Sequence, residues 1–289
     1  GESIWEIKQY IGYVSTALQW EYRISINLQN VLLSGFFDSI GLYQSPTEEQ
    51  IVIAKQWLVL LGMEKQWDKS YNKLSYGEQR LLLIARAMVK QPALLILDPQ
   101  NDLTNTSGKL FPASKAVLRK FNVIANINTL TSQYRDAGAT IIYSPIVFSA
   151  GYPEAGENPY GVISSIIESG AMIKGTQGGE IDGIFDKKEG DIVIERSAII
   201  AFEGTDLENI LRDKKITTLV LVGLLSDVCI EGTMRVAYSK GYEVFTLTDA
   251  TATLSLQKQE ITSLYSYPLF SKVINTEKAL SLIECAAKS

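Results

Sequence analysis

The feature that most constrains the fold is a series of short apolar runs, rich in β-branched residues, that alternate with stretches of helical periodicity. The runs cover 93–98, 139–144, 191–195, 216–222, 242–248 and 272–274. Between two of them, Val123, Ile127, Leu130 and Tyr134 recur at helical spacing and Gly138 ends the pattern. Strands that alternate with helices predict a doubly wound parallel sheet with helices on both faces, which is a three-layer αβα fold.

One strand-to-helix turn carries a cysteine. The run 216–222 leads through Gly223 to Cys229, and Ile230, Met234 and Ala237 follow at helical spacing. This pattern places Cys229 at or just before a first helical turn, where amide N–H groups and the helix dipole favour a thiolate and can hold an oxyanion. The alternative is a buried structural cysteine that behaves as a small hydrophobe.

Two other strands deliver charged residues. The run 93–97 ends at Asp98, at the carboxyl edge of the predicted sheet, where ligands of open parallel sheets bind. The run 191–195 is followed by Arg196. Each also has a structural interpretation, since a strand-end aspartate often caps a helix or anchors a loop, and Arg196 could pair with Glu195 or Asp98 without any chemistry. Asp102 is more typical of a turn-stabilising residue than of a second acid.

Composition excludes several classes of protein. The net charge of −5 and pI near 5.1 argue against a nucleic-acid surface. No run of 18 apolar residues occurs, so no membrane span is predicted. Histidine is absent, which eliminates Ser–His–Asp and Cys–His catalysis and histidine-based zinc sites. We therefore expect neither a metal site nor a cofactor.

The cysteine content and the start of the chain bear on location. The two cysteines, Cys229 and Cys285, are too few for a disulfide framework, so we expect a reducing cytoplasm. The chain begins at Gly1 rather than at methionine and shows no signal peptide, so we expect a processed or truncated chain.

Four motifs, in a fixed order, resemble the isochorismatase-like cysteine hydrolases, a group that includes nicotinamidases, ureido-acid amidohydrolases and isochorismatases. They are Asp-x-Gln-Asn-Asp at 98–102, Gly-Thr-x-Gly at 175–178, Ala-Phe-x-Gly-Thr-Asp-Leu at 201–207 and Asp-Val-Cys-x-x-x-Thr at 227–233. The resemblance spans residues 93 to about 270 and implies an isochorismatase-like sheet. A long Gly-, Pro- and Ser-rich loop at 149–175 is expected to lie over the pocket.

The resemblance also implies roles for individual residues. Cys229 matches the family nucleophile and Asp98 the family base, whereas Arg196 stands where the family has lysine. Backbone N–H groups of Leu225 and Cys229 would hold the oxyanion, and the family's cis peptide would fall between Leu224 and Leu225. Arginine keeps the positive charge but is forked and is not deprotonated.

The N-terminal part is different, with helix signals in place of strands. Residues 45–61 combine cap candidates with apolar helical spacing, and Ser75 and Glu78 are spaced as a capping box. The region 8–98 resembles the helical subdomain of molybdate-type ABC ATPases, and its signature-like hexapeptide consists of Leu74, Ser75, Tyr76, Gly77, Glu78 and Gln79.

No Gly-x-x-x-x-Gly-Lys-Ser/Thr phosphate loop occurs in the sequence, and Pro99 replaces the glutamate expected after the Walker B aspartate. We therefore expect no ATP turnover, and a vestigial or packing role for the segment. The strand 93–98 belongs to both resemblances, so the joint looks like a recombination point.

These observations predict two domains, a mostly helical segment at 1–91 and a cysteine hydrolase domain at 92–289. The predicted reaction is hydrolysis of an amide-type C–N bond in a small molecule, through Cys229, Asp98 and Arg196 and a thioester. The alternative is a catalytically impaired fusion, because arginine replaces the lysine. Isochorismate ether hydrolysis is a lesser alternative, because that reaction does not use the cysteine. Self-association stays open, since relatives often form oligomers while the added helices could block that interface.

Overall fold

The computed structural model describes residues 26–37, 39–89 and 92–281. The earlier part of the predicted helical segment, residues 1–25, and Cys285 lie outside the described residues. A single sheet of six parallel strands forms the centre of the larger part of the chain, in the order β3-β2-β1-β4-β5-β6. The strands are β1 Ala93–Leu97, β2 Thr140–Ser144, β3 Ile192–Val193, β4 Thr218–Leu224, β5 Glu243–Ala252 and β6 Lys272–Ile274.

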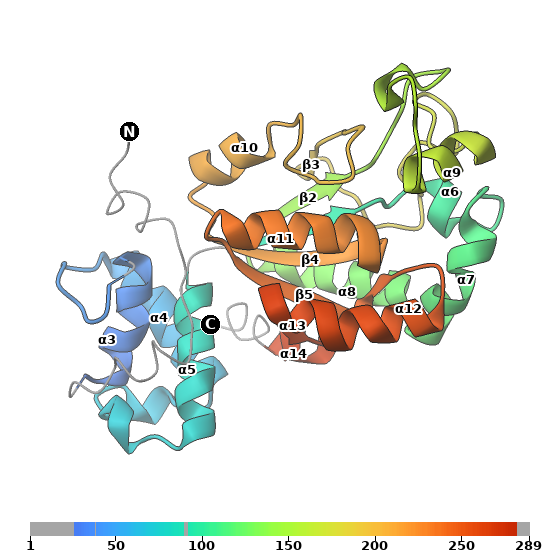
Figure 1. The fold of residues 1–289 in the computed structure, drawn as a ribbon. Helices are drawn as coiled ribbons and strands as arrows, with labels where there is room; N and C mark the ends of the chain where they lie inside the picture. Colours follow the sequence, from blue (N-terminus) through green and yellow to red (C-terminus); the bar gives the residue numbers. More distant parts are fainter. Residues whose placement is uncertain (1–25, 38, 90–91, 282–289) are drawn as a thin grey trace.

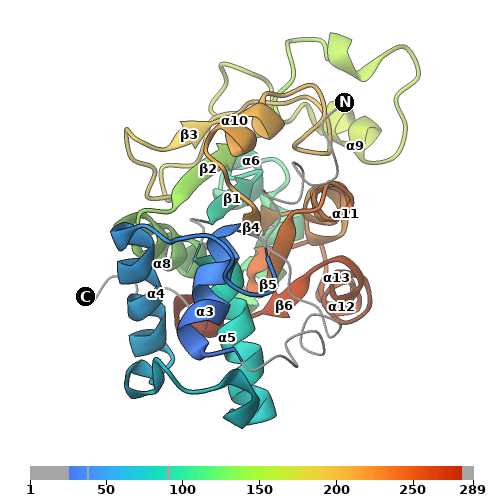
Figure 2. The ribbon, with the colours of Figure 1, turned by 90° about the vertical axis from the view of Figure 1, so that its left-hand side faces the viewer.

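The predicted three layers are present. Alternate residues of a strand point to opposite faces, so Leu94 and Ile96 of β1 pack in one core while Leu95 and Leu97 pack in the other. Helices α7 (Phe111–Lys120), α8 (Val123–Asp136) and α14 (Thr276–Ser281) cover the first face. Helices α10 (Leu207–Asp213), α11 (Glu231–Ser239) and α13 (Tyr267–Phe270) contribute to the second core. Figure 2 shows α8 and α11 on opposite sides of the strands.

Short helices lie around the carboxyl ends of the strands. They are α6 (Asn101–Thr104), α9 (Val162–Ser169) and α12 (Leu256–Ile261). In Figure 1, α6 and α9 lie at the end of the sheet remote from the N-terminal helices. A candidate site is expected at the carboxyl edge of such a sheet. These helices and the loops between them therefore surround the expected position of the site.

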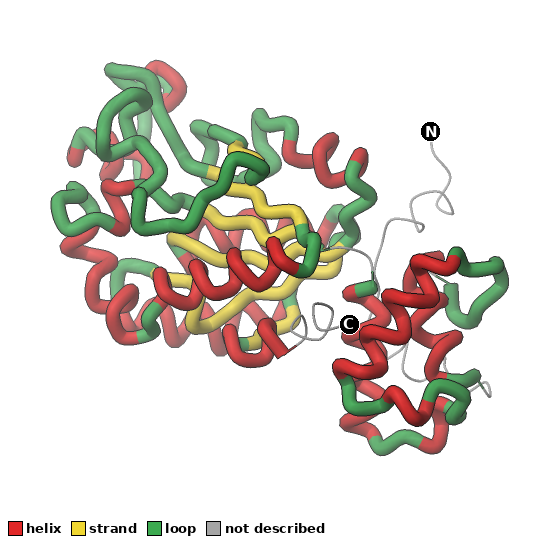
Figure 3. Tube along the Cα trace, turned by 180° about the vertical axis from the view of Figure 1, so that it is seen from behind, coloured by secondary structure: helices red, strands yellow, loops and turns green. Residues whose placement is uncertain are grey.

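The N-terminal helices pack together beside the sheet, and their apolar side chains belong to the same core as Leu94 and Ile96 of β1. Helices α3 (Leu28–Leu33), α4 (Glu48–Leu60) and α5 (Tyr76–Met88) pack through side chains that include Leu32, Leu58 and Leu82. Figure 3 shows this part as helices and loops beside the strands. Thr47 with Gln50, and Ser75 with Glu78, form the capping boxes of α4 and α5. The helical character of the segment is confirmed over the described residues.

Three details differ from the sequence prediction. The region 149–175 was expected to be a loop, but it contains α9 and a 3₁₀ turn at Pro153–Ala155. Strand β3 has only two residues, although Ile194 N–H still donates to Tyr143 O at 2.8 Å and prolongs the pairing. Strand β5 extends to Ala252, four residues beyond the prediction, and it contains a register irregularity against β4.

Candidate active site

Asp98 is the first residue after β1 and is buried at the carboxyl edge of the sheet. Its φ of 50° is a left-handed conformation that non-glycine residues seldom adopt. Its N–H donates to Ser144 O of β2 at 3.2 Å, which fixes the turn. The neighbouring strand supports this turn, since a Cβ on Gly223 would lie 2.1 Å from Leu97 O. Only glycine therefore fits where β4 passes the end of β1.

Arg196 reaches Asp98 from the segment that follows β3. Its Nη2 lies 2.8 Å from Asp98 Oδ1, and both side chains are almost completely buried. Nη1 donates to Ser144 O at 2.7 Å, and Nη2 also donates to Ile199 O at 3.4 Å. The forked guanidinium thus contacts a carboxylate and two carbonyl groups at once through two separate nitrogens, whereas an ammonium group has a single nitrogen.

Cys229 completes the cluster from the other side. It lies in a π-helical turn, Ser226–Ile230, between β4 and α11, and it is 4% exposed. Its thiol lies within hydrogen-bonding reach of both Asp98 and Arg196. The structure therefore brings together the three side chains that the sequence singled out, although they are separated by up to 131 positions.

The electrostatics of the cluster correct one expectation. Burial, together with the Asp98 charge, raises the pKa of the Cys229 thiol well above its usual value, and the opposing effect of Arg196 is smaller. The prediction that this turn favours a thiolate is therefore wrong for the resting structure. Burial also raises the pKa of Asp98, against the charge of Arg196. Although burial lowers it, the pKa of Arg196 is raised overall by Asp98 and Cys229. Arg196 is thus a permanent cation beside two groups that can exchange a proton.

The backbone before Cys229 has the predicted cis form. The peptide between Leu224 and Leu225 is cis and is not followed by proline. The backbone N–H of Leu225 lowers the pKa of the Cys229 thiol, against the larger effect of burial. A donor aimed at the nucleophile is also close to where an attacked carbonyl oxygen would develop charge.

A network behind the cysteine turn holds it in place. Ser226 Oγ donates to Gln259 Oε1 at 2.7 Å, and Gln259 Nε2 donates to Thr251 Oγ1 at 3.2 Å. The Tyr267 hydroxyl lies 3.4 Å from Ser226 O and 3.3 Å from Thr251 Oγ1. Sequence reasoning missed Gln259 and Tyr267, because neither belongs to a motif and only the folded chain brings α12 and α13 behind the turn.

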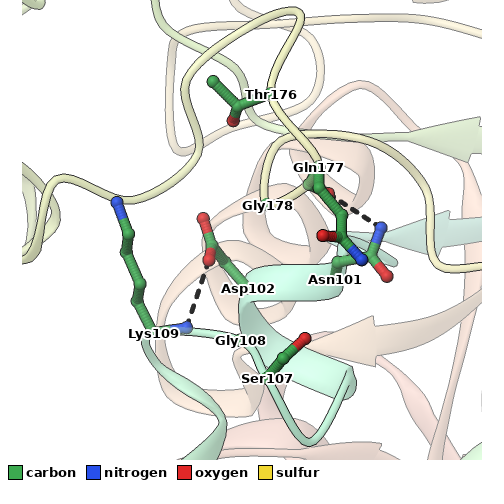
Figure 4. A pocket seen from close by; sticks show the side chains of 8 residues that line it. All are labelled: Asn101, Asp102, Ser107, Gly108, Lys109, Thr176, Gln177 and Gly178. Carbon is green, nitrogen blue, oxygen red and sulfur yellow. Dashed lines mark hydrogen bonds between the residues drawn. The ribbon is translucent and has the colours of Figure 1, made fainter.

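The other residues of the first motif fasten loops to the sheet. Asn101 Nδ2 donates to Gln177 O at 2.8 Å, and the Asp102 carboxylate accepts from Met172 N–H at 2.7 Å and Lys109 N–H at 3.1 Å. Figure 4 shows Asn101 and Asp102 in a cavity of about 250 Å³ beneath the loop that carries the Gly-Thr-x-Gly motif. A Cβ on Gly178 would lie 2.2 Å from Asp102 Oδ2, which explains the last glycine. Asp102 thus stabilises turns, as its structural interpretation predicted.

The signature-like hexapeptide is not part of this cluster. Ser75 and Glu78 cap α5, Leu74 is buried, and Gln79 Nε2 lies 3.3 Å from Leu74 O. These residues begin a helix in the part of the chain that precedes β1, whereas Asp98 follows β1 (Figure 1). Within the described residues, no group of three or more Cys, Asp and Glu side chains has the arrangement of a metal site. None of the helices in the described ranges is long and apolar enough to cross a membrane.

Comparison with known proteins agrees with this architecture. The isochorismatase domain model matches residues 92–278, and the ABC transporter model matches residues 2–100. The chain therefore belongs to the isochorismatase domain family and carries an N-terminal ABC transporter fragment. A solved cysteine hydrolase from Pseudomonas syringae pv. phaseolicola 1448A aligns with a TM-score of 0.60 at 20% identity, covering 68% of this chain and 93% of that one. At that identity the likeness concerns the fold.

Two curated relatives correspond to the two parts. The ABC transporter ATP-binding protein ModF of Escherichia coli (strain K12) is 47% identical over 123 residues, which are 42% of this chain and 24% of ModF. The ureidoacrylate amidohydrolase RutB of Klebsiella pneumoniae (strain 342) is 31% identical over 173 residues, which are 56% of this chain and 73% of RutB. The chain thus spans about a quarter of its ABC relative and nearly three quarters of its hydrolase relative.

Proposed function

We propose that the chain hydrolyses the C–N bond of a small amide through a thioester on Cys229. The observation that carries this proposal is the buried contact of the Cys229 thiol with Asp98, which is itself paired with Arg196 at 2.8 Å. A nucleophile within reach of a base that a third group orients is the arrangement on which covalent hydrolysis depends. The 31% identity to an amidohydrolase supports an amide as the bond that is cleaved.

The raised pKa values indicate how the first step would run. At rest the thiol keeps its proton, because burial and the Asp98 charge oppose a thiolate. Asp98 accepts that proton as the sulfur attacks the amide carbonyl, so the negative charge moves from carboxylate to substrate oxygen without a second anion forming beside the first. Arg196 compensates the single negative charge of the cluster throughout. The N–H groups of Leu225 and Cys229 receive the oxyanion.

The same proton then serves the second half of the reaction. Asp98 returns it to the leaving nitrogen as the C–N bond breaks, which releases ammonia or an amine and leaves an acyl group on the sulfur. A water molecule, deprotonated by Asp98, next attacks the thioester, and the carboxylic acid leaves with the thiol restored. Each carboxylate step needs Asp98 to alternate between its two protonation states, and the opposing effects of burial and Arg196 keep both accessible.

A panel of small amides and carbamoyl compounds, assayed for ammonia release, tests the proposal. We expect at least one member to be hydrolysed, and Cys229→Ala to abolish that activity. The matched control is Cys285→Ala, which removes the other cysteine and should leave turnover unchanged. Turnover that survives Cys229→Ala would reject the thioester mechanism. A panel without any substrate, together with an unmodified Cys229, would favour the impaired fusion.

A further inference from the structure

A second cavity, of about 480 Å³, is lined in part by the residues that directly follow Arg196. Its volume falls in the range that holds small organic ligands. Its lining includes Phe148, Glu154, Asn158, Ile163 and residues 197–199. The lining combines aromatic and aliphatic side chains with one carboxylate and one amide, so it suits a compound with an apolar body.

The chain connects this cavity directly to Arg196. Ser197, Ala198 and Ile199 follow Arg196 in sequence, and the Ile199 carbonyl accepts from Arg196 Nη2 at 3.4 Å. Phe148, which also lines the cavity, follows Val147, whose backbone N–H donates to Arg196 O at 2.7 Å. The wall of this cavity is therefore in contact with Arg196, one member of the buried cluster, so the cavity could hold the part of an amide that does not react.

Glu154 is an exposed residue in the wall of the cavity, and hydrogen bonds to Ser149 hold its carboxylate in place. Its Oε1 and Oε2 accept from the Ser149 N–H at 3.0 and 3.2 Å, and Oε1 also accepts from the Ser149 hydroxyl. These hydrogen bonds, led by that of the hydroxyl, lower the pKa of Glu154, so the carboxyl group is ionised at neutral pH. The negative charge is thus fixed in position rather than carried on a freely rotating side chain.

Nearby cations are already neutralised. Among the described residues that line the cavity, Glu154 alone carries a charge at neutral pH. The backbone N–H of Lys174 donates to Phe148 O, and the side chain of Lys174 forms an ion pair with Glu195. Arg196 is paired with Asp98. An anionic ligand would therefore meet a carboxylate without an available lysine or arginine among these residues.

We propose that this cavity selects uncharged or cationic amides and that Glu154 excludes amides carrying a carboxylate. The proposal rests on the proposed function and narrows its substrate class to compounds such as aromatic carboxamides. Ureido acids are anions, so the proposal predicts that they are not the preferred substrates of this chain. Even beside an exposed carboxylate, like charges a few ångströms apart repel enough to weaken binding about tenfold at low salt.

The test measures binding separately from turnover. Nicotinamide and 5-carbamoylnicotinate differ by one carboxylate, and their affinities for the full-length Cys229→Ala protein can be measured by calorimetry. We expect the neutral compound to bind about tenfold more tightly, and the difference to shrink at high salt. Equal affinities, tighter binding of the anion, or no measurable binding of nicotinamide would overturn the inference. Because the variant lacks the nucleophile, this result does not depend on whether amides are hydrolysed.

Variants of Glu154 assign the effect to one side chain. Glu154→Gln keeps an acceptor for Ser149 but removes the charge, so the two affinities should converge, whereas Glu154→Lys should favour the anion. The matched control is Glu157→Gln, which removes an exposed carboxylate from the same loop but not from the cavity wall. A control that reduces discrimination as much as Glu154→Gln would assign the effect to the general charge of the loop and contradict a role for Glu154.

Discussion

Two ion pairs, each with a buried carboxylate, lie at opposite ends of the same sheet, and their comparison shows what makes one of them a candidate active site. Asp98 and Arg196 meet beyond the carboxyl ends of β1 and β3. Glu243 and Lys272 are the first residues of β5 and β6 and pair at the amino ends. In both pairs burial raises the pKa of the carboxyl group and the cation opposes the change. Charge burial alone therefore does not identify a catalytic group.

The surroundings of the two pairs differ. Asp98 has a left-handed backbone, a thiol within reach and a cavity beyond its partner arginine. Glu243 lies near Arg86 of α5, whose charge acts on both Glu243 and Lys272. In the described part of the chain no cysteine accompanies this second pair. We infer that the first pair serves chemistry, whereas the second stabilises the sheet where the N-terminal helices approach it.

The largest effect is expected for Asp98→Asn. The variant keeps the shape of the side chain but removes the base, so kcat/KM should fall about a thousandfold. The same change removes the charge that raises the pKa of Cys229, while Arg196 remains, so the thiol pKa should fall and alkylation at neutral pH should become faster. Steady-state kinetics and the pH dependence of iodoacetamide labelling measure the two effects.

A fall in turnover together with faster alkylation is the response expected only of a base beside a thiol. If turnover persists within fivefold of the wild type, or if labelling slows with Asp98→Asn, the assigned role of Asp98 is wrong. In the wild type, activity should be lost as the pH falls through a pKa above the usual aspartate range, because the raised pKa of Asp98 protonates the base at a higher pH.

For the second ion pair, Lys272→Met should affect stability rather than turnover. It leaves the buried Glu243 carboxylate without its partner, and we expect a loss of about 3 kcal/mol in the free energy of unfolding. Denaturant unfolding measures this loss, and kcat/KM per folded molecule should stay within twofold of the wild type. Lys214→Met, at an exposed position, is the matched control and should cost less than about 0.5 kcal/mol.

A double variant completes that comparison. Glu243→Leu with Lys272→Met removes both charges, so stability should recover toward the wild-type value. A fall in turnover as large as that of Asp98→Asn, in a variant that is still folded, would remove the distinction between the two pairs.

Arg196→Lys should have a smaller effect than Asp98→Asn on turnover and than Lys272→Met on stability. Lysine keeps the charge beside Asp98 but cannot also reach both Ser144 O and Ile199 O, so we expect kcat/KM to fall about tenfold. Arg196→Met should reduce it further, because the charge is lost as well. A higher kcat/KM in Arg196→Lys would show instead that the arginine impairs the site, as the alternative of an impaired fusion requires.

The sequence predicted the sheet well because each strand carries its own local signal. β1, β2 and β4 are short, largely apolar runs bounded by turns, and pairing them in parallel leaves few topologies. Helix α9 was missed although Val162, Ile163, Ile166 and Ile167 have helical spacing, because the Gly, Pro and Ser residues around it favoured a loop. The periodicity was the better signal there.

The site was only partly predictable for a physical reason. Asp98, Arg196 and Cys229 could be selected because they follow strands or a strand-to-helix turn. The direction in which the thiol pKa shifts could not be predicted, since it depends on how deeply Cys229 is buried and how close Asp98 lies. Glu154 was missed because it lines the same cavity as residues 197–199, which are more than 40 positions away in the sequence. Only the folded chain brings the two segments together.

The central claim is that the sulfur of Cys229 carries the acyl group of an amide during turnover. Rapid acid quenching of the protein mixed with a hydrolysed amide, followed by mass spectrometry of the peptide that contains Cys229, tests it most directly. The account predicts a mass increase equal to the acyl group on this peptide, which decays at the rate of product formation. Ammonia release at full rate with an unmodified Cys229 at every time point would contradict it.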